Sequence, residues 1–158
     1  MKTITYKGLS MNTNYEEELT QEQFEQLRKQ YYAKPNKADV IDEIANLVSQ
    51  NGTKNSLITD YYVKDLMAKV GSYDSKWCIE DVFEYKPLLD VFYARTLTNK
   101  KVFYSDDLLT NIETAIRLGG AGICRKVGNY PIKSVDEIFK RYNVNNNYYD
   151  MSCGWGGD

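Results

Sequence analysis

The residues with the most distinctive chemistry lie in one glycine-rich stretch, residues 150–157, which reads Asp-Met-Ser-Cys-Gly-Trp-Gly-Gly. Its carboxylate, Asp150, can accept hydrogen bonds from a ligand, and its glycines lack the Cβ that keeps a backbone away from one. Tyr148 and Tyr149 precede the carboxylate and are typical of a buried strand. Because ligands of open α/β sheets bind outside the carboxyl ends of the strands, this order predicts a ligand-binding loop.

The same stretch resembles the D-x-S/F-x-G-x-G-G signature of the S-adenosylmethionine-dependent DNA amino-methyltransferases, in particular that of their phage-encoded branch. In that family the loop lies against the methionine part of the cofactor. The resemblance extends more loosely back to about Cys78 and includes a helical lead-in at residues 135–142. The family usually has an arginine after the glycines, where this chain has Asp158. By this resemblance the cofactor-binding residues are Asp150, Ser152, Cys153, Gly154, Gly156 and Gly157.

The resemblance covers the cofactor loop but not the catalytic motif of the family. That motif has two consecutive prolines and holds the amine of a flipped base, whereas Asn129-Tyr130-Pro131 contains a single proline. We expect the motif, and the carboxylate that would hold the cofactor ribose, beyond Asp158. The chain is therefore expected to be an N-terminal fragment of a phage-type DNA methyltransferase-like protein with no activity of its own. It would bind S-adenosylmethionine only with the downstream domain present, and DNA only in the full-length context.

Composition excludes several other classes of site. The chain has no His, which removes the commonest metal ligand and the commonest general base at neutral pH. Its 3 Cys are far apart and form no Cys-x-x-Cys pair, so we expect no metal site. A net charge of −2 is not typical of a protein that binds DNA by itself, because such proteins usually carry a cluster of Lys and Arg. Without a long apolar run or an apolar signal region, we expect no membrane partner and a cytoplasmic location, in the host cell if the protein is phage-encoded.

The patterning predicts a mainly α fold. A helical domain is expected over residues 1–145, and residues 146–158 would form the first strand and glycine-rich loop of a truncated Rossmann-like α/β methyltransferase domain. A short strand is expected to end at Gly8. Helices are expected at residues 21–32, 37–50 and 56–70, from Pro87 to about Arg95, from Ser105 to about Leu118, and from Ser134 to about Tyr142.

Local signals support several of these boundaries. Thr20 with Gln23, and Ser134 with Glu137, have the spacing of capping boxes. Trp77 is expected to anchor neighbouring helices. The second helix has the clearest apolar stripe, which consists of Val40, Ile41, Ile44, Leu47 and Val48.

A second hypothesis belongs to a different class of protein. The sequence pI of 5.3, the 14 Tyr and the lack of catalytic groups also suit a complete small interaction protein. It would be a phage-type inhibitor that binds a host or defence enzyme such as a nuclease. A fragment should leave residues 148–158 loose beside an exposed apolar patch, whereas a complete protein should bury them.

Overall fold

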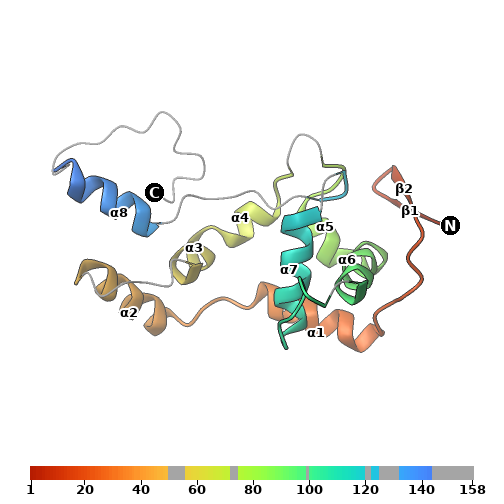
Figure 1. The fold of residues 1–158 in the computed structure, drawn as a ribbon, viewed down its shortest axis with the longest axis horizontal. Helices are drawn as coiled ribbons and strands as arrows, with labels where there is room; N and C mark the ends of the chain where they lie inside the picture. Colours follow the sequence, from red (N-terminus) through yellow and green to blue (C-terminus); the bar gives the residue numbers. More distant parts are fainter. Residues whose placement is uncertain (50–55, 72–74, 99, 120–121, 125–131, 144–158) are drawn as a thin grey trace. The chain divides into compact units, whose positions relative to one another are not determined.

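The computed structural model describes residues 1–49, 56–71, 75–98, 100–119, 122–124 and 132–143. Within these ranges the protein is mainly helical and has one two-stranded antiparallel sheet (Figure 1), so the predicted mainly α fold is confirmed. The predicted strand and loop at residues 146–158, and the boundary before them, lie outside the described residues. The elements are β1 (Lys2–Tyr6), β2 (Leu9–Thr13), α1 (Gln21–Tyr32), α2 (Lys37–Val48), α3 (Ser56–Tyr62), α4 (Lys64–Ala68), α5 (Ile79–Glu84), α6 (Lys86–Thr98), α7 (Leu108–Gly119) and α8 (Ile132–Arg141).

The chain divides into two compact units that are not continuous in sequence. The first unit comprises Met1–Ala33 and Ala68–Val127, and so contains the hairpin, α1, α5, α6 and α7. The second comprises Lys34–Met67 and Gly128–Asp158, and contains α2, α3, most of α4 and α8. Each unit is therefore assembled from two distant parts of the sequence.

The first unit opens with a β-hairpin whose turn requires left-handed backbone. Lys7 and Gly8 have φ values of 50° and 76°, which is the pattern of a two-residue type I′ turn. The strands pair from Lys2 opposite Thr13 to Tyr6 opposite Leu9. The predicted first strand is present, but it ends at Tyr6 and Gly8 lies in the turn. The second strand was not predicted, because its sequence Leu-Ser-Met-Asn-Thr is mostly polar.

Substitution of Gly8 by Ala should destabilise the protein by about 1–2 kcal/mol, because a Cβ is disfavoured in left-handed backbone. A Cβ at Gly8 would meet no atom within 4 Å, so this cost comes from the backbone alone. Gly71→Ala is the matched control, since its Cβ would make an ordinary contact of 3.5 Å with the Trp77 carbonyl. Urea unfolding of both variants measures the difference, and equal free energies of unfolding would contradict the explanation.

Helix α1 begins where the capping signal predicts. The Thr20 hydroxyl accepts a hydrogen bond from the Gln23 N–H at 3.1 Å, and the Gln23 amide oxygen accepts one from the Thr20 N–H at 2.9 Å. The helix ends at Tyr32, and Ala33 is extended with ψ of 123° as the chain approaches Pro35. The capping box and the predicted limits of this helix are confirmed.

Two helix boundaries in the second unit differ from the prediction. The single helix expected over residues 56–70 is broken at Val63 into α3 and α4, and the Val63 side chain is buried. The aromatic and β-branched residues at the break, Tyr61, Tyr62 and Val63, have low helix propensity, which favours an interruption there. Helix α8 starts at Ile132, so Ser134 lies inside the helix and is not its N-cap. A start directly after Pro131 in the sequence agrees with the preference for proline at helix beginnings.

The hydrophobic core of the first unit is centred on α5 and α6. Phe83, Leu88 and Phe92 are fully buried, and the Tyr31 ring of α1 stacks on Phe83 with centroids 4.0 Å apart. Trp77 is buried as expected, but its polar contacts fix the hairpin and the segment after α7. Its indole N–H donates to the Tyr6 carbonyl at 3.1 Å, and its backbone N–H donates to the carbonyl of Ile123 at 2.9 Å.

The apolar stripe predicted on α2 is only partly used as core. Val40 is buried, whereas Ile41 is 55% exposed and Ile44 is 37% exposed. Tyr62 and Leu66 of the same unit are 63% and 56% exposed. The amphipathic pattern predicted the helix correctly, but it did not predict that Ile41 and Ile44 would stay exposed among the described residues.

Candidate functional site

The predicted cofactor-binding residues lie outside the part of the chain that the structure describes. The described residue nearest to them in sequence is Asn143, which follows α8 and has left-handed backbone with φ of 53°. The Tyr142 N–H still donates to the Ile138 carbonyl at 3.0 Å, and α8 ends at Arg141, close to the predicted end at about Tyr142. The residues that remain without described geometry are Asp150, Ser152, Cys153, Gly154, Gly156 and Gly157.

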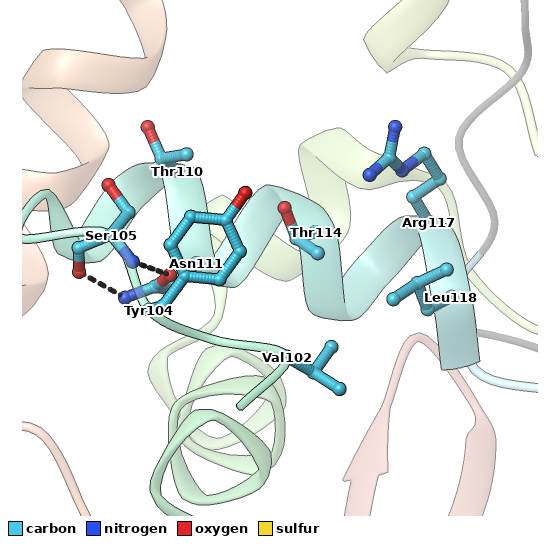
Figure 2. A pocket seen from close by; sticks show the side chains of 8 residues that line it. All are labelled: Val102, Tyr104, Ser105, Thr110, Asn111, Thr114, Arg117 and Leu118. Atoms are coloured by element: carbon cyan, nitrogen blue, oxygen red, sulfur yellow. Dashed lines mark hydrogen bonds between the residues drawn. The ribbon is translucent and has the colours of Figure 1, made fainter. Parts of the chain in front are cut away.

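The first unit contains a pocket of about 470 Å³ beside α7, which Figure 2 shows from close by. One wall is α7, and the other is the segment that leads into this helix. A volume of this size falls in the range of small-molecule sites. The lining residues are Val102, Tyr104, Ser105, Thr110, Asn111, Thr114, Arg117 and Leu118.

One end of the pocket is held rigid by side chain to backbone hydrogen bonds. The Asn111 amide accepts from the Ser105 N–H at 3.1 Å and donates to the Ser105 carbonyl at 2.7 Å (Figure 2). The Ser105 hydroxyl also accepts from the Asp107 N–H at 3.1 Å. The loop in front of α7 is therefore fixed against the helix before any ligand arrives.

The same hydrogen bonds correct the predicted start of this helix. The helix was expected to start at Ser105, but α7 begins at Leu108, and the Asp107 carboxylate accepts from the Thr110 N–H at 3.0 Å. The Thr110 hydroxyl donates to the same carboxylate at 2.6 Å, and these hydrogen bonds lower the pKa of Asp107 below its ordinary value. Ser105 forms a turn onto Asp107 instead, because serine hydroxyls readily bond the backbone two residues on.

The rest of the pocket presents groups that are free to bind. Arg117 lies in the last turn of α7, where a cation is favourable, and no carboxylate in the described part of the chain pairs with it. The Tyr104 side chain is 83% exposed, and Leu118 is 63% exposed. Thr114 adds a hydroxyl between Thr110 and Arg117 on one face of the helix, since these residues are spaced i, i+4 and i+7. The pocket offers one cation, hydroxyls and an exposed aromatic ring, which suit binding rather than acid–base catalysis.

The carboxylates buried in the first unit are used by the fold. Asp81 accepts from the Lys7 ammonium at 2.5 Å and from the Cys78 N–H at 3.0 Å, and thereby joins the hairpin turn to the start of α5. Burial raises the pKa of Asp81, but these hydrogen bonds outweigh it and hold the pKa below its ordinary value. Asp90 accepts from the Leu19 N–H at 2.9 Å and pairs with Lys86 at 2.9 Å. Both carboxylates are occupied, so neither is a candidate general base.

The two described cysteines are poor nucleophiles. Burial raises the pKa of the Cys124 thiol to about 12, and burial is also the largest cause of the raised pKa of Cys78. Nucleophilic and metal-binding cysteines need the thiolate, which neither environment favours at neutral pH. Across the described ranges, no cluster of His, Cys, Asp and Glu has the arrangement to hold a metal ion.

Sequence reasoning missed this pocket, although one local signal pointed to it. Thr110, Thr114 and Arg117 share the polar face of a helix that was predicted from its apolar face. The contribution of Tyr104 depends on how the preceding loop folds back, which no periodicity encodes.

Comparison with protein-family models, with curated proteins and with solved structures yields no match. Among the described helices, none combines the length and the apolar character needed to cross a membrane.

Proposed function

We propose that the chain is the N-terminal part of a phage-type DNA amino-methyltransferase-like protein, and that residues 150–157 contact S-adenosylmethionine. The observation that carries the proposal is the sequence Asp-Met-Ser-Cys-Gly-Trp-Gly-Gly, with aromatic residues before it and glycines at the spacing of the family loop. Helix α8 and the left-handed Asn143 support it, because a helix that ends shortly before the strand predicted from the sequence is the order expected where such a sheet begins.

The chemistry of the loop suits a cofactor that carries a sulfonium and an amino acid group. Gly154, Gly156 and Gly157 would let backbone N–H groups approach the ligand closely, and Asp150 would accept hydrogen bonds from its ammonium. Ser152 and Cys153 would pack beside the methionine part. Transfer of a methyl group also requires the motif that holds the amine of a flipped base, so these residues bind the cofactor and do not complete the reaction.

The proposal is tested by isothermal titration of S-adenosylmethionine into residues 1–158 and into a chain that continues past Asp158 through the catalytic motif. We expect affinity of about micromolar strength for the longer chain and no measurable binding to residues 1–158. A micromolar dissociation constant corresponds to about 8 kcal/mol of binding free energy, which is well within calorimetric reach.

A matched pair of variants distinguishes a specific effect of the loop on affinity from a general effect of charge. Asp150→Ala in the longer chain should weaken binding at least tenfold, because the ligand ammonium loses a charged acceptor. Asp42→Ala removes one exposed carboxylate from α2 and should leave binding unchanged. A longer chain that does not bind, or one whose affinity is insensitive to Asp150→Ala, would overturn the proposal.

One observation favours the alternative of a small phage-type inhibitor of a host or defence enzyme such as a nuclease. Ile41, Ile44, Tyr62 and Leu66 of the second unit are apolar and substantially exposed, and exposed apolar residues in number are typical of protein interfaces. Under this alternative, Ile41→Glu should abolish inhibition of the target enzyme, and neither length of chain should bind S-adenosylmethionine.

A further inference from the structure

We propose that the pocket beside α7 binds a nucleotide, with its phosphate at Arg117 and its base against Tyr104. The pocket lies in the first unit and shares no residue with the proposed cofactor loop. The inference is carried by the geometry of described residues and does not depend on the methyltransferase proposal.

The charges of the pocket favour an anionic ligand at one end. Arg117 is the only formally charged residue among those that line it, and its guanidinium has no ion-pair partner within the described chain. Glu113 lies four positions before Arg117 on α7 but forms no ion pair with it in the described chain, and the Asp107 carboxylate accepts two hydrogen bonds from Thr110 and caps α7. Thr110 is separated from Arg117 by about 10 Å along the helix at 1.5 Å per residue. A guanidinium that is free and planar is the preferred protein group for a phosphate.

Tyr104 provides the surface for a base. Its side chain is 83% exposed, and the described residues give its ring no aromatic or cationic partner. Exposed aromatic rings beside a cationic group are the platforms on which unpaired bases stack. Val102 and Leu118, 38% and 63% exposed, add apolar surface that a base or sugar could cover.

The size and rigidity of the pocket favour a nucleotide over a larger partner as its ligand. A pocket of about 470 Å³ can hold one base with its sugar and phosphate, but a stacked duplex cannot enter it. The two hydrogen bonds between Asn111 and Ser105 hold the loop in place, so binding would order few additional groups. Thr114 offers a hydroxyl between the two ends of the pocket. A protein partner is less suited, because a hot-spot tyrosine is normally surrounded by a wide interface rather than by a polar pocket.

The ligand chemistry is a base joined to a phosphate, which either a free mononucleotide or a unit of a single strand can supply. Fluorescence anisotropy of a labelled twelve-nucleotide thymidine strand tests the second source, and competition by thymidine monophosphate and by adenosine monophosphate tests the first. We expect Tyr104→Ala to weaken strand binding about tenfold or more, as loss of one base stack does. Arg117→Ala should weaken it to a similar extent and lower the salt dependence by about one phosphate contact.

Control variants and conservative variants distinguish an effect of the pocket on binding from an effect of overall charge or of folding. Lys29→Ala removes one exposed cation from α1 and Tyr62→Ala removes one exposed aromatic ring from α3, and each should change binding less than twofold. Tyr104→Phe keeps the ring and Arg117→Lys keeps the charge, so both should bind more tightly than the alanine variants. Competition by a mononucleotide supports a free nucleotide as the ligand, whereas binding of the strand alone supports a strand. No binding in either arm, or equal losses for pocket and control variants, would overturn the proposal.

Discussion

Phe83→Ala is expected to destabilise the first unit by about 3–5 kcal/mol, the range for removing a large side chain from a core. Phe83 is fully buried in α5, and its ring stacks on Tyr31 with centroids 4.0 Å apart and planes inclined by 9°. Truncation therefore removes both the buried apolar area and the only described aromatic contact between α1 and α5. A loss of this size is comparable with the whole stability of a small domain.

The measurement is the free energy of unfolding in urea, followed by circular dichroism at 222 nm. Tyr104→Ala is the matched control, because it removes a ring that is 83% exposed and should change stability by less than about 0.5 kcal/mol. Phe83→Leu keeps most of the buried volume and should cost roughly half as much as the alanine variant. If Phe83→Ala and Tyr104→Ala unfold at the same urea concentration, the assignment of the core to α5 and α6 is wrong.

The parts of the fold that could be predicted are those decided by a few neighbouring residues. The capping box of Thr20 and Gln23 satisfies two N–H groups within four positions, so the start of α1 follows from local sequence. Pro87 lies in the first turn of α6, where its missing N–H costs nothing. Tertiary contacts decide the other boundaries. The Leu19 N–H and the Lys7 ammonium find their acceptors 71 and 74 residues away, and no local pattern contains that information.

The same distinction explains what could be predicted of the sites. The loop at residues 150–157 is a contiguous motif, so it could be proposed as a cofactor site from its amino-acid sequence alone. The pocket is lined by both Tyr104 and Arg117. The loop that carries Tyr104 is held in place by the hydrogen bonds between the Asn111 side chain and the backbone of Ser105. Periodicity predicted the buried residues of α7, such as Ile112 and Ile116, but it carries no information about which loop covers the opposite face.

Asp90 illustrates how a buried carboxylate can have a structural role. In the structure the Asp90 side chain is 8% exposed, accepts the Leu19 N–H at 2.9 Å, and pairs with the Lys86 ammonium at 2.9 Å. It therefore ties the segment before α1 to the first turn of α6.

Asp90→Ala should lower the free energy of unfolding by about 2–4 kcal/mol. The substitution leaves the backbone N–H of Leu19 without its acceptor in a buried environment, which costs about 1–3 kcal/mol. It also leaves the ammonium of Lys86, which is 21% exposed, with only Glu18 at 3.9 Å as a partner. Removal of one member of a largely buried pair is costly because the other charge stays desolvated.

Two further variants divide this effect between the hydrogen bond and the charge. Asp90→Asn keeps an oxygen that can accept the Leu19 N–H but loses the ion pair, and Lys86→Met keeps the hydrogen bond and most of the apolar stem. We expect each to cost about 1 kcal/mol, well below Asp90→Ala, because each leaves one of the two interactions in place. Equal losses for Asp90→Asn and Asp90→Ala would assign the whole effect to the charge. Full stability of Asp90→Ala would contradict the structural role, because a tie between two segments cannot be removed without cost to folding.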